Sequence, residues 1–278
     1  MHARQAAVAV ALVLVAGPRL YAQELSPALR TPFDAGVQAL RAGRLDEAEA
    51  AFQRVLREGG RTAFVHNNLA IVYQRREQHD RAVLQLREAI RLDPAYVAPR
   101  ILLGASLLAL GRVDEATAAL ERAVKLAPRE PLARQQLARA YEKAGNLPAA
   151  VEQYRTLRDL APNDPESAYQ LGRAYLALSE WSLKQLREVD PGSARLHQAL
   201  GHNYRVQGKP EMAEQAFRRA AEADPRLPEI HLALAQLFVE QKRWAEARTE
   251  IERELALVPE SAGARLLQQR LEAEEKAP

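Results

Sequence analysis

Residues 97–128 read VAPRILLGASLLALGRVDEATAALERAVKLAP, and this stretch predicts the fold. A first apolar run ends at Gly111, and a glycine suits the position just after a helix C-terminus. Asp114 and Glu115 open a second apolar run, where acids favour a helix N-terminus, and Pro128 closes it. The stretch therefore predicts two helices joined by a tight turn.

Dipeptides that end in proline recur along the chain. Their prolines are 34, 34, 29, 34 and 34 residues apart. A fixed period in this range is typical of a solenoid, in which each repeat packs only against its neighbours. The dipeptides are Asp93-Pro94, Ala127-Pro128, Ala161-Pro162, Asp190-Pro191, Asp224-Pro225 and Val258-Pro259.

Two small positions recur with the same period. Small residues let two helix backbones approach closely, and a large residue one turn further on fills the space beside them. In the first helices the recurring pairs are Leu69-Ala70, Leu103-Gly104, Leu137-Ala138, Leu171-Gly172, Leu200-Gly201 and Leu234-Ala235. In the second helices they are Ala48 with Phe52, Ala82 with Leu86, Ala116 with Leu120, Ala150 with Tyr154, Ala213 with Phe217 and Ala247 with Ile251.

These recurring positions resemble the tetratricopeptide repeat. The resemblance covers residues 29–261 in seven units and implies an all-α fold, a helical solenoid or α-α superhelix. The first unit is degenerate, because Gly59-Gly60 stand where the closing Asp-Pro is expected. The tryptophan typical of the first helix is missing, so that contact must be made differently. In its place stand His66, Arg100, Arg134, His197 and His231.

The end of the chain reads as one more helix. Residues 262–275 carry Leu266, Leu267 and Leu271 on one side and charges on the other. A solenoid needs such a polar-backed cap on its last repeat. We therefore expect a C-terminal capping helix at 262–275.

The short repeat at residues 165–191 is the irregular place in the array. It lacks five residues where its internal turn belongs, and 168–189 contains no proline and only one glycine. One long helix over 168–189 is the preferred prediction, which would join two sub-solenoids, 29–165 and 190–275. A pinched hairpin that turns near Ser179 is the alternative, and a deletion that only changes the curvature is a third interpretation.

The N-terminus has the layout of a secretory signal peptide. Residues 1–22 combine the charge of Arg4, a 12-residue apolar run, a break at Pro18 and a small residue at Ala22. Residues 23–28 are then a linker. We expect an exported protein, periplasmic or secreted. The alternative is anchoring by an uncleaved N-terminal segment, which would be the only membrane contact.

Composition and charge exclude several classes of function. Without Arg4 and Arg19 the chain has 37 Lys+Arg against 36 Asp+Glu, and no basic stripe of the kind that binds nucleic acid. There is no cysteine, so disulfides and thiolate metal sites are excluded. No catalytic or phosphate-loop motif is present. We therefore expect no enzyme activity, no cofactor and no metal.

The resemblance implies that first helices line a concave groove that binds peptides or extended segments. Its amide and guanidinium groups suit backbone carbonyls and carboxylates, and Ile101, Ala105 and Leu108 would form an apolar floor. A known clamp for C-terminal carboxylates is absent, because Phe33 and Val37 occupy two of its positions. The candidate groove residues are Asn67, Asn68, Gln74, Arg75, Gln135, Gln136, Arg139, Lys143, Tyr169, Gln170, Arg173, Gln198, His202 and Arg205.

The function that follows is binding. We expect a non-catalytic protein–protein interaction scaffold or adaptor of the bacterial cell envelope, with a protein or peptide partner whose identity the sequence does not give. One alternative is an assembly or regulatory subunit of an envelope enzyme or secretion complex, which would dock by its convex face or by the short repeat near Trp181. A hydrolase hidden in the repeats is disfavoured, because the helices of the array use residues 29–275.

Overall fold

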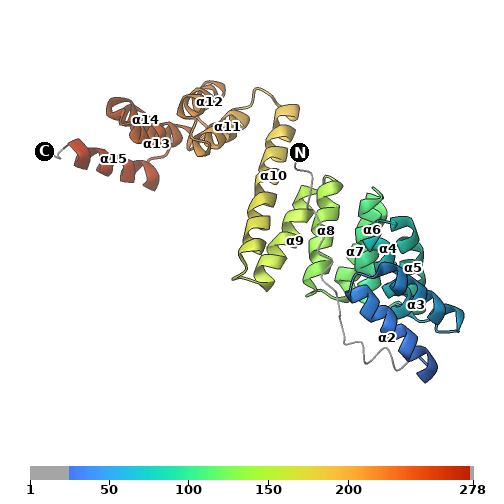
Figure 1. Ribbon diagram of the computed structural model, residues 1–278. Helices are drawn as coiled ribbons and strands as arrows, with labels where there is room; N and C mark the ends of the chain where they lie inside the picture. Colours follow the sequence, from blue (N-terminus) through green and yellow to red (C-terminus); the bar gives the residue numbers. More distant parts are fainter. Residues whose placement is uncertain (1–24, 276–278) are drawn as a thin grey trace, which may run out of the picture. The chain divides into compact units, whose positions relative to one another are not determined.

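The computed structural model describes residues 25–275, and these form fourteen α-helices and no β-strand (Figure 1). The predicted signal peptide, residues 1–22, lies outside the described residues. Within 25–275, no helix is both long and apolar enough to cross a membrane. The first eight helices are α2 Pro27–Arg41, α3 Leu45–Arg57, α4 Ala63–Arg75, α5 His79–Leu92, α6 Val97–Ala109, α7 Val113–Leu126, α8 Pro131–Lys143 and α9 Leu147–Leu160.

The chain divides into two compact units, residues 1–176 and 177–278, and the division falls inside the long helix α10. We call them unit 1 and unit 2 and describe each by itself. The last six helices are α10 Pro165–Val189, α11 Ala194–Val206, α12 Pro210–Ala223, α13 Ile230–Glu240, α14 Trp244–Leu257 and α15 Ala262–Glu275.

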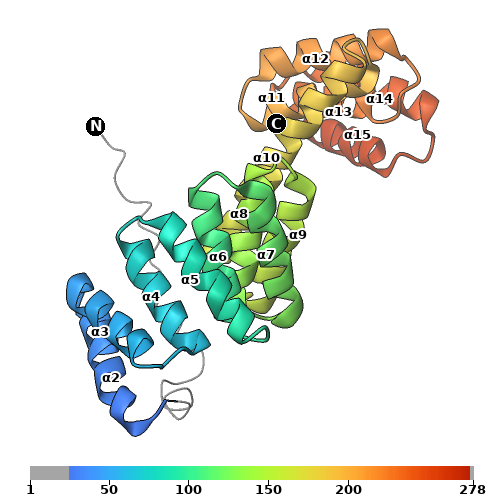
Figure 2. The ribbon, with the colours of Figure 1, turned by 90° about the vertical axis from the view of Figure 1, so that its right-hand side faces the viewer.

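Unit 1 is a stack of helix pairs. Consecutive helices from α2 to α9 pack side by side, as both ribbon views show (Figures 1 and 2). The first helices of successive pairs also meet, α2 with α4, α4 with α6 and α6 with α8, whereas the second helices α3, α5, α7 and α9 do not approach one another as closely. A stack that is tighter along one layer curves toward it. The first helices therefore form the inner layer of the stack in unit 1.

A glycine opposite a large side chain sets the distance within several pairs. A Cβ added to Gly36 would lie 2.8 Å from the ring of Phe52, and one added to Gly104 would overlap the side chain of Leu120. Phe52 and Leu120 are fully buried. The expected close approach of backbones at the small positions is thus confirmed at these pairs, and the same contact joins Gly201 to Phe217 in unit 2.

The place of the missing tryptophan is held by a hydrogen bond between the two helices of a pair. His66 Nδ1 lies 2.7 Å from Gln85 Oε1 in α5, and His231 Nδ1 lies 2.7 Å from Glu250 Oε2 in α14. Arg134 Nη1 donates to Gln153 Oε1 at 2.8 Å with the same 19-residue separation. A polar link thus takes over the role of an aromatic contact in these repeats.

The predicted turn at Gly111 is present. Gly111 follows the C-cap of α6 with a φ of +74°, in the left-handed region that favours glycine. Its amide donates to Leu108 O at 3.2 Å, and the next amide donates to Leu107 O at 2.9 Å. Glu77 takes the same place after α4 at a φ of +60°, so the turn geometry is kept where the sequence has no glycine.

The short repeat is one continuous helix, α10, of 25 residues. The predicted long helix is confirmed, and the alternative hairpin near Ser179 is wrong. Only Leu171 and Ala174 of this helix are buried. A Cβ added to Gly172 would meet nothing within 4 Å. In the other repeats the second helix folds back and packs a large side chain here, whereas in α10 the chain continues as the same helix.

Unit 2 has its own core. Helices α11 to α14 pair in the same manner as in unit 1, and α15 packs against α13 and α14. Phe217, Ile230 and Phe238 are fully buried at the centre of this core. Helix α15 occupies the range expected for the capping helix, and its own residue Leu271 is buried.

Candidate partner-binding groove

The predicted groove residues fall into both units. Those on α4, α8 and the first part of α10 belong to unit 1, and those on α11 belong to unit 2. Asn67, Gln136 and Gln198 are buried and present almost no open surface. Of the expected apolar floor, Ile101 and Leu108 are buried as well.

On α4, two predicted groove residues fasten neighbouring repeats. The amide of Gln74 donates to Leu102 O at 2.8 Å and to Ser106 Oγ at 2.7 Å in α6. Arg75 Nη1 donates to Leu40 O at 2.6 Å at the end of α2. Asn68 Nδ2 is held by Phe64 O at 2.8 Å within its own helix. The bonds of Gln74 and Arg75 join neighbouring repeats, so these side chains have a structural role.

On α11, the predicted residues also link helices. Arg205 Nη1 donates to Gln236 Oε1 of α13 at 2.8 Å, and Gln198 Nε2 donates to Pro228 O at 3.3 Å. The ring of His202 meets Phe217 edge-on at 5.0 Å between centroids. Burial lowers the pKa of His202, with a further contribution from the positive charge of Arg205. The imidazole is therefore held neutral at pH 7.

The α8 and α10 residues are more open. Gln135, Arg139 and Gln170 are half-buried, Lys143 is exposed, and Tyr169 is 61% exposed. Arg173 lies beside Glu142, with 3.7 Å between Nη2 and Oε1, and its side chain remains half exposed. This part of unit 1 keeps free surface where α4 does not.

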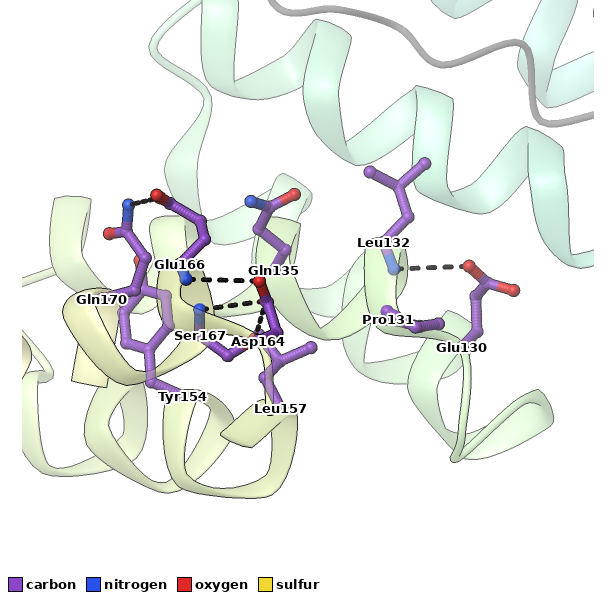
Figure 3. A pocket seen from close by; sticks show the side chains of 10 residues that line it. All are labelled: Glu130, Pro131, Leu132, Gln135, Tyr154, Leu157, Asp164, Glu166, Ser167 and Gln170. Atoms are coloured by element: carbon purple, nitrogen blue, oxygen red, sulfur yellow. Dashed lines mark hydrogen bonds between the residues drawn. The ribbon is translucent and has the colours of Figure 1, made fainter. Parts of the chain in front are cut away.

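A cavity of about 360 Å³ opens between α8, α9 and α10 (Figure 3). Its first wall is the start of α8, and its second wall is the start of α10. Tyr154 and Leu157 of α9 line it between these walls. The lining residues are Glu130, Pro131, Leu132, Gln135, Tyr154, Leu157, Asp164, Glu166, Ser167 and Gln170. Apolar side chains with a few converging polar groups are typical of binding sites.

Two acids of this cavity, Glu130 and Asp164, lie at the N-termini of α8 and α10. Asp164 accepts from the amide of Ser167 at 3.0 Å and from its hydroxyl, and these hydrogen bonds hold the pKa of Asp164 below its usual value. Glu130 accepts from the amide of Leu132 at 3.3 Å. Figure 3 shows the Glu130 bond at the start of α8 and the Asp164 bonds at the start of α10. A negative charge at a helix N-terminus is stabilised by the helix dipole.

Tyr154 is a neutral phenol at the base of the cavity. Burial, together with the nearby carboxylate of Glu142, raises the pKa of Tyr154 to about 12. The side chain is 3% exposed, so it offers a ring edge to an occupant and remains protonated at pH 7.

A second cavity of about 300 Å³ lies one repeat earlier, at the start of α6. Tyr96, Val97 and Ile101 line it together with Asp93, and Glu130 borders both cavities. The two cavities therefore form a row along the N-terminal ends of the concave helices in unit 1. Each has at least one carboxylate at its edge.

Sequence reasoning found Gln135 and Gln170 but missed the acids. The candidate residues include no acid, whereas Glu130, Asp164 and Glu166 border the cavity. The signal was present, because acids precede or open these first helices, where they serve as caps. Among the described residues, no cluster of three or more His, Asp or Glu side chains could hold a metal ion.

Two models of the tetratricopeptide repeat match this chain. One matches residues 33–97 and 199–274, and the other matches residues 73–135 and 107–174. The chain belongs to the tetratricopeptide repeat family. Proteins of this family are commonly protein–protein interaction scaffolds and are generally non-catalytic. No curated protein matches the chain in sequence.

Several solved structures are similar to this chain. A tetratricopeptide repeat protein of Parabacteroides merdae has a TM-score of 0.52 at 11% identity, with 89% of this chain and 100% of that chain covered. PilF of Pseudomonas aeruginosa has a TM-score of 0.47 at 18% identity, with 87% and 97% covered. The Cut9–Hcn1 hetero-tetramer of the APC/C has a TM-score of 0.45 at 20% identity, with 87% of this chain but 42% of that chain covered.

Proposed function

We propose that this protein is a non-catalytic adaptor of the bacterial cell envelope that holds an extended segment of a partner protein against the concave face of unit 1. The observation that supports the proposal is the cavity between α8, α9 and α10, which opens on the concave layer and combines apolar walls with amide groups. Residues 1–22, with their charged, apolar and small-residue regions, support export.

The chemistry of the cavities describes the segment they would bind. Leu132 and Leu157 offer apolar contact, and Gln135 and Gln170 offer amides to a peptide backbone. First helices of neighbouring repeats lie about 10 Å apart, and an extended chain advances about 3.3 Å per residue. The row of two cavities therefore suits apolar side chains about three residues apart. Basic residues beside them would complement the acids at the edges.

Site-specific photocrosslinking tests the proposal in the cell that makes the protein. A photoreactive phenylalanine replaces Gln135 in one variant and the exposed Arg155 of α9 in a matched control. We expect a crosslinked partner from position 135 and none from position 155. A third variant carries the probe at Trp181 of α10, where capture would instead support docking by the short repeat.

A second variant tests occupancy of the cavity itself. Gln135→Trp fills the space between α8 and α10, so we expect the photocrosslinked partner segment, made as a synthetic peptide, to bind at least about tenfold more weakly. Arg155→Trp should bind the same peptide as wild type does. Equal binding by both variants would show that the cavity is not the site.

A further inference from the structure

Helix α10 carries several large apolar side chains that are exposed. Tyr169, Leu176 and Val189 are 61%, 67% and 83% exposed, although they are large apolar side chains. The helix is continuous from Pro165 to Val189, as Figure 1 shows, and buries only two residues. Tyr169 and Leu176 lie on the same side of this helix, seven residues apart, whereas Val189 lies on the opposite side.

Two exposed apolar residues of α10 and a half-buried leucine follow a heptad pattern. Tyr169, Leu176 and Leu183 are seven residues apart, which places them on one side of the helix. Between them lie Gly172 and Ser179, both exposed, and Leu186 continues the series. Gly172 has open space around it, so a helix of another molecule could approach there closely. This row is the seam of a short coiled coil without its partner helix.

Charges of alternating sign border the seam on one flank. Glu166, Arg173, Glu180 and Arg187 are again seven residues apart, and all four are exposed. The flank on the other side of the seam carries Ala168, Tyr175 and Ser182, which have no charge. In a coiled coil, flanking charges decide which helix pairs with which and in what orientation.

This charge order is complementary to itself in one orientation only. When two α10 helices run antiparallel with the two-fold axis between Leu176 and Ala177, Arg173 faces Glu180 of the second copy. The same axis brings Glu166 opposite Arg187 of the second copy. The two-fold symmetry then makes four opposite-charge pairs. A parallel pair would set the charged flank against the uncharged one and make none.

We propose that two copies of this chain associate through antiparallel pairing of their α10 helices. The apolar seam of Tyr169, Leu176 and Leu183 is buried in the pair, and the four charge pairs fix the register. The proposal does not depend on the proposed function, because it concerns self-association and is measured with no partner present. Arg173 and Glu180, on which its test relies, do not line the cavity of unit 1.

Charge exchange between the two copies gives the decisive test. We expect sedimentation velocity of the purified wild type to show a concentration-dependent dimer. Arg173→Glu and Glu180→Arg, each alone, put like charges together and should raise the dissociation constant about tenfold or more. The double variant Arg173→Glu with Glu180→Arg restores opposite charges and should restore dimerisation. Helical circular dichroism confirms that each variant is folded.

Three results would overturn the proposal: a wild type that stays monomeric across the concentration range, single variants that dimerise like wild type, or a double variant that is no better than the single ones. A monomeric wild type would leave the α10 surface to a different protein, and unaffected single variants would place the dimer contact elsewhere.

Crosslinking through an introduced cysteine tests the register independently. The chain has no cysteine, so Leu176→Cys places one thiol per copy beside the proposed axis. We expect oxidation to give a covalent dimer. In the control Ser182→Cys the two thiols would be separated by about 16 Å along the helix axis, too far for a disulfide. Equal crosslinking of both variants, or none of Leu176→Cys, would contradict the antiparallel register.

Discussion

Single glycines set how closely two helices of a repeat approach. Gly104 has no room for a Cβ, because the buried side chain of Leu120 fills the space, whereas Gly172 occupies the corresponding place in α10 and meets nothing. The same residue type thus serves close packing in one repeat and is left without a contact in another. What differs is whether a second helix packs a side chain against the glycine.

Alanine substitution separates these two situations. Gly104→Ala should lower the free energy of unfolding by about 1–3 kcal/mol, because a methyl group is forced into a filled space. Gly172→Ala should raise it by up to about 1 kcal/mol, because alanine is the better helix former and nothing obstructs its methyl group. Urea unfolding followed by circular dichroism measures both. A destabilised Gly172→Ala would mean that a side chain of the protein lies against Gly172.

At the scale of the element, α10 departs from the repeat. Every other repeat in unit 1 breaks its chain with a turn between two helices, but α10 runs for 25 residues. Its sequence has neither proline nor glycine after Gly172 until Pro191, so no residue favours a turn. Continuation of the helix is the result, because each added residue gains a backbone hydrogen bond.

A proline in the middle of α10 tests this continuity. Ser179→Pro removes one backbone donor and clashes with the preceding turn, at a cost of about 3 kcal/mol in a helix. We expect faster amide hydrogen exchange from Tyr175 to Leu183, while α4 to α7 keep their protection. Ser179→Ala is the control, and its protection should equal that of wild type or exceed it. Unchanged exchange in the proline variant would indicate that this segment turns rather than continues.

At the scale of the molecule, each unit has a core of its own. Phe52 lies fully buried in the core of unit 1, and Phe217 lies fully buried in the core of unit 2. In a solenoid a repeat is stabilised chiefly by its own packing and by its nearest neighbours. A cavity made in one core should therefore lower stability mainly within that unit.

Phenylalanine-to-alanine substitutions test this separation. Phe52→Ala should destabilise α2 to α5 by about 3–5 kcal/mol, and Phe217→Ala should do the same to α11 to α14. Hydrogen exchange measured by mass spectrometry resolves the two units. We expect each substitution to accelerate exchange in its own unit and to leave the other unit at wild-type protection. Equal acceleration in both units by either variant would mean that the chain unfolds as one cooperative block.

The sequence by itself determined the repeat, its helix pairs and the long helix at 165–189. Each follows from a signal that can be read along the chain. These signals are the repeat period, a glycine such as Gly111 after a helix, and the absence of proline or glycine that would end the long helix. The groove itself stays a prediction, although the first helices on which it was placed do meet from repeat to repeat in unit 1.

Only the tertiary structure decided which of the candidate groove residues form hydrogen bonds within the protein. Gln74 and Arg75 donate hydrogen bonds to neighbouring helices, and Asn67 is buried. These contacts arise because packing between repeats brings together residues about 30 positions apart in the sequence. The cavity with Glu130 and Asp164 at its edge likewise arises where three helices meet. A repeat pattern specifies which way a side chain points, but what it meets depends on the next repeat.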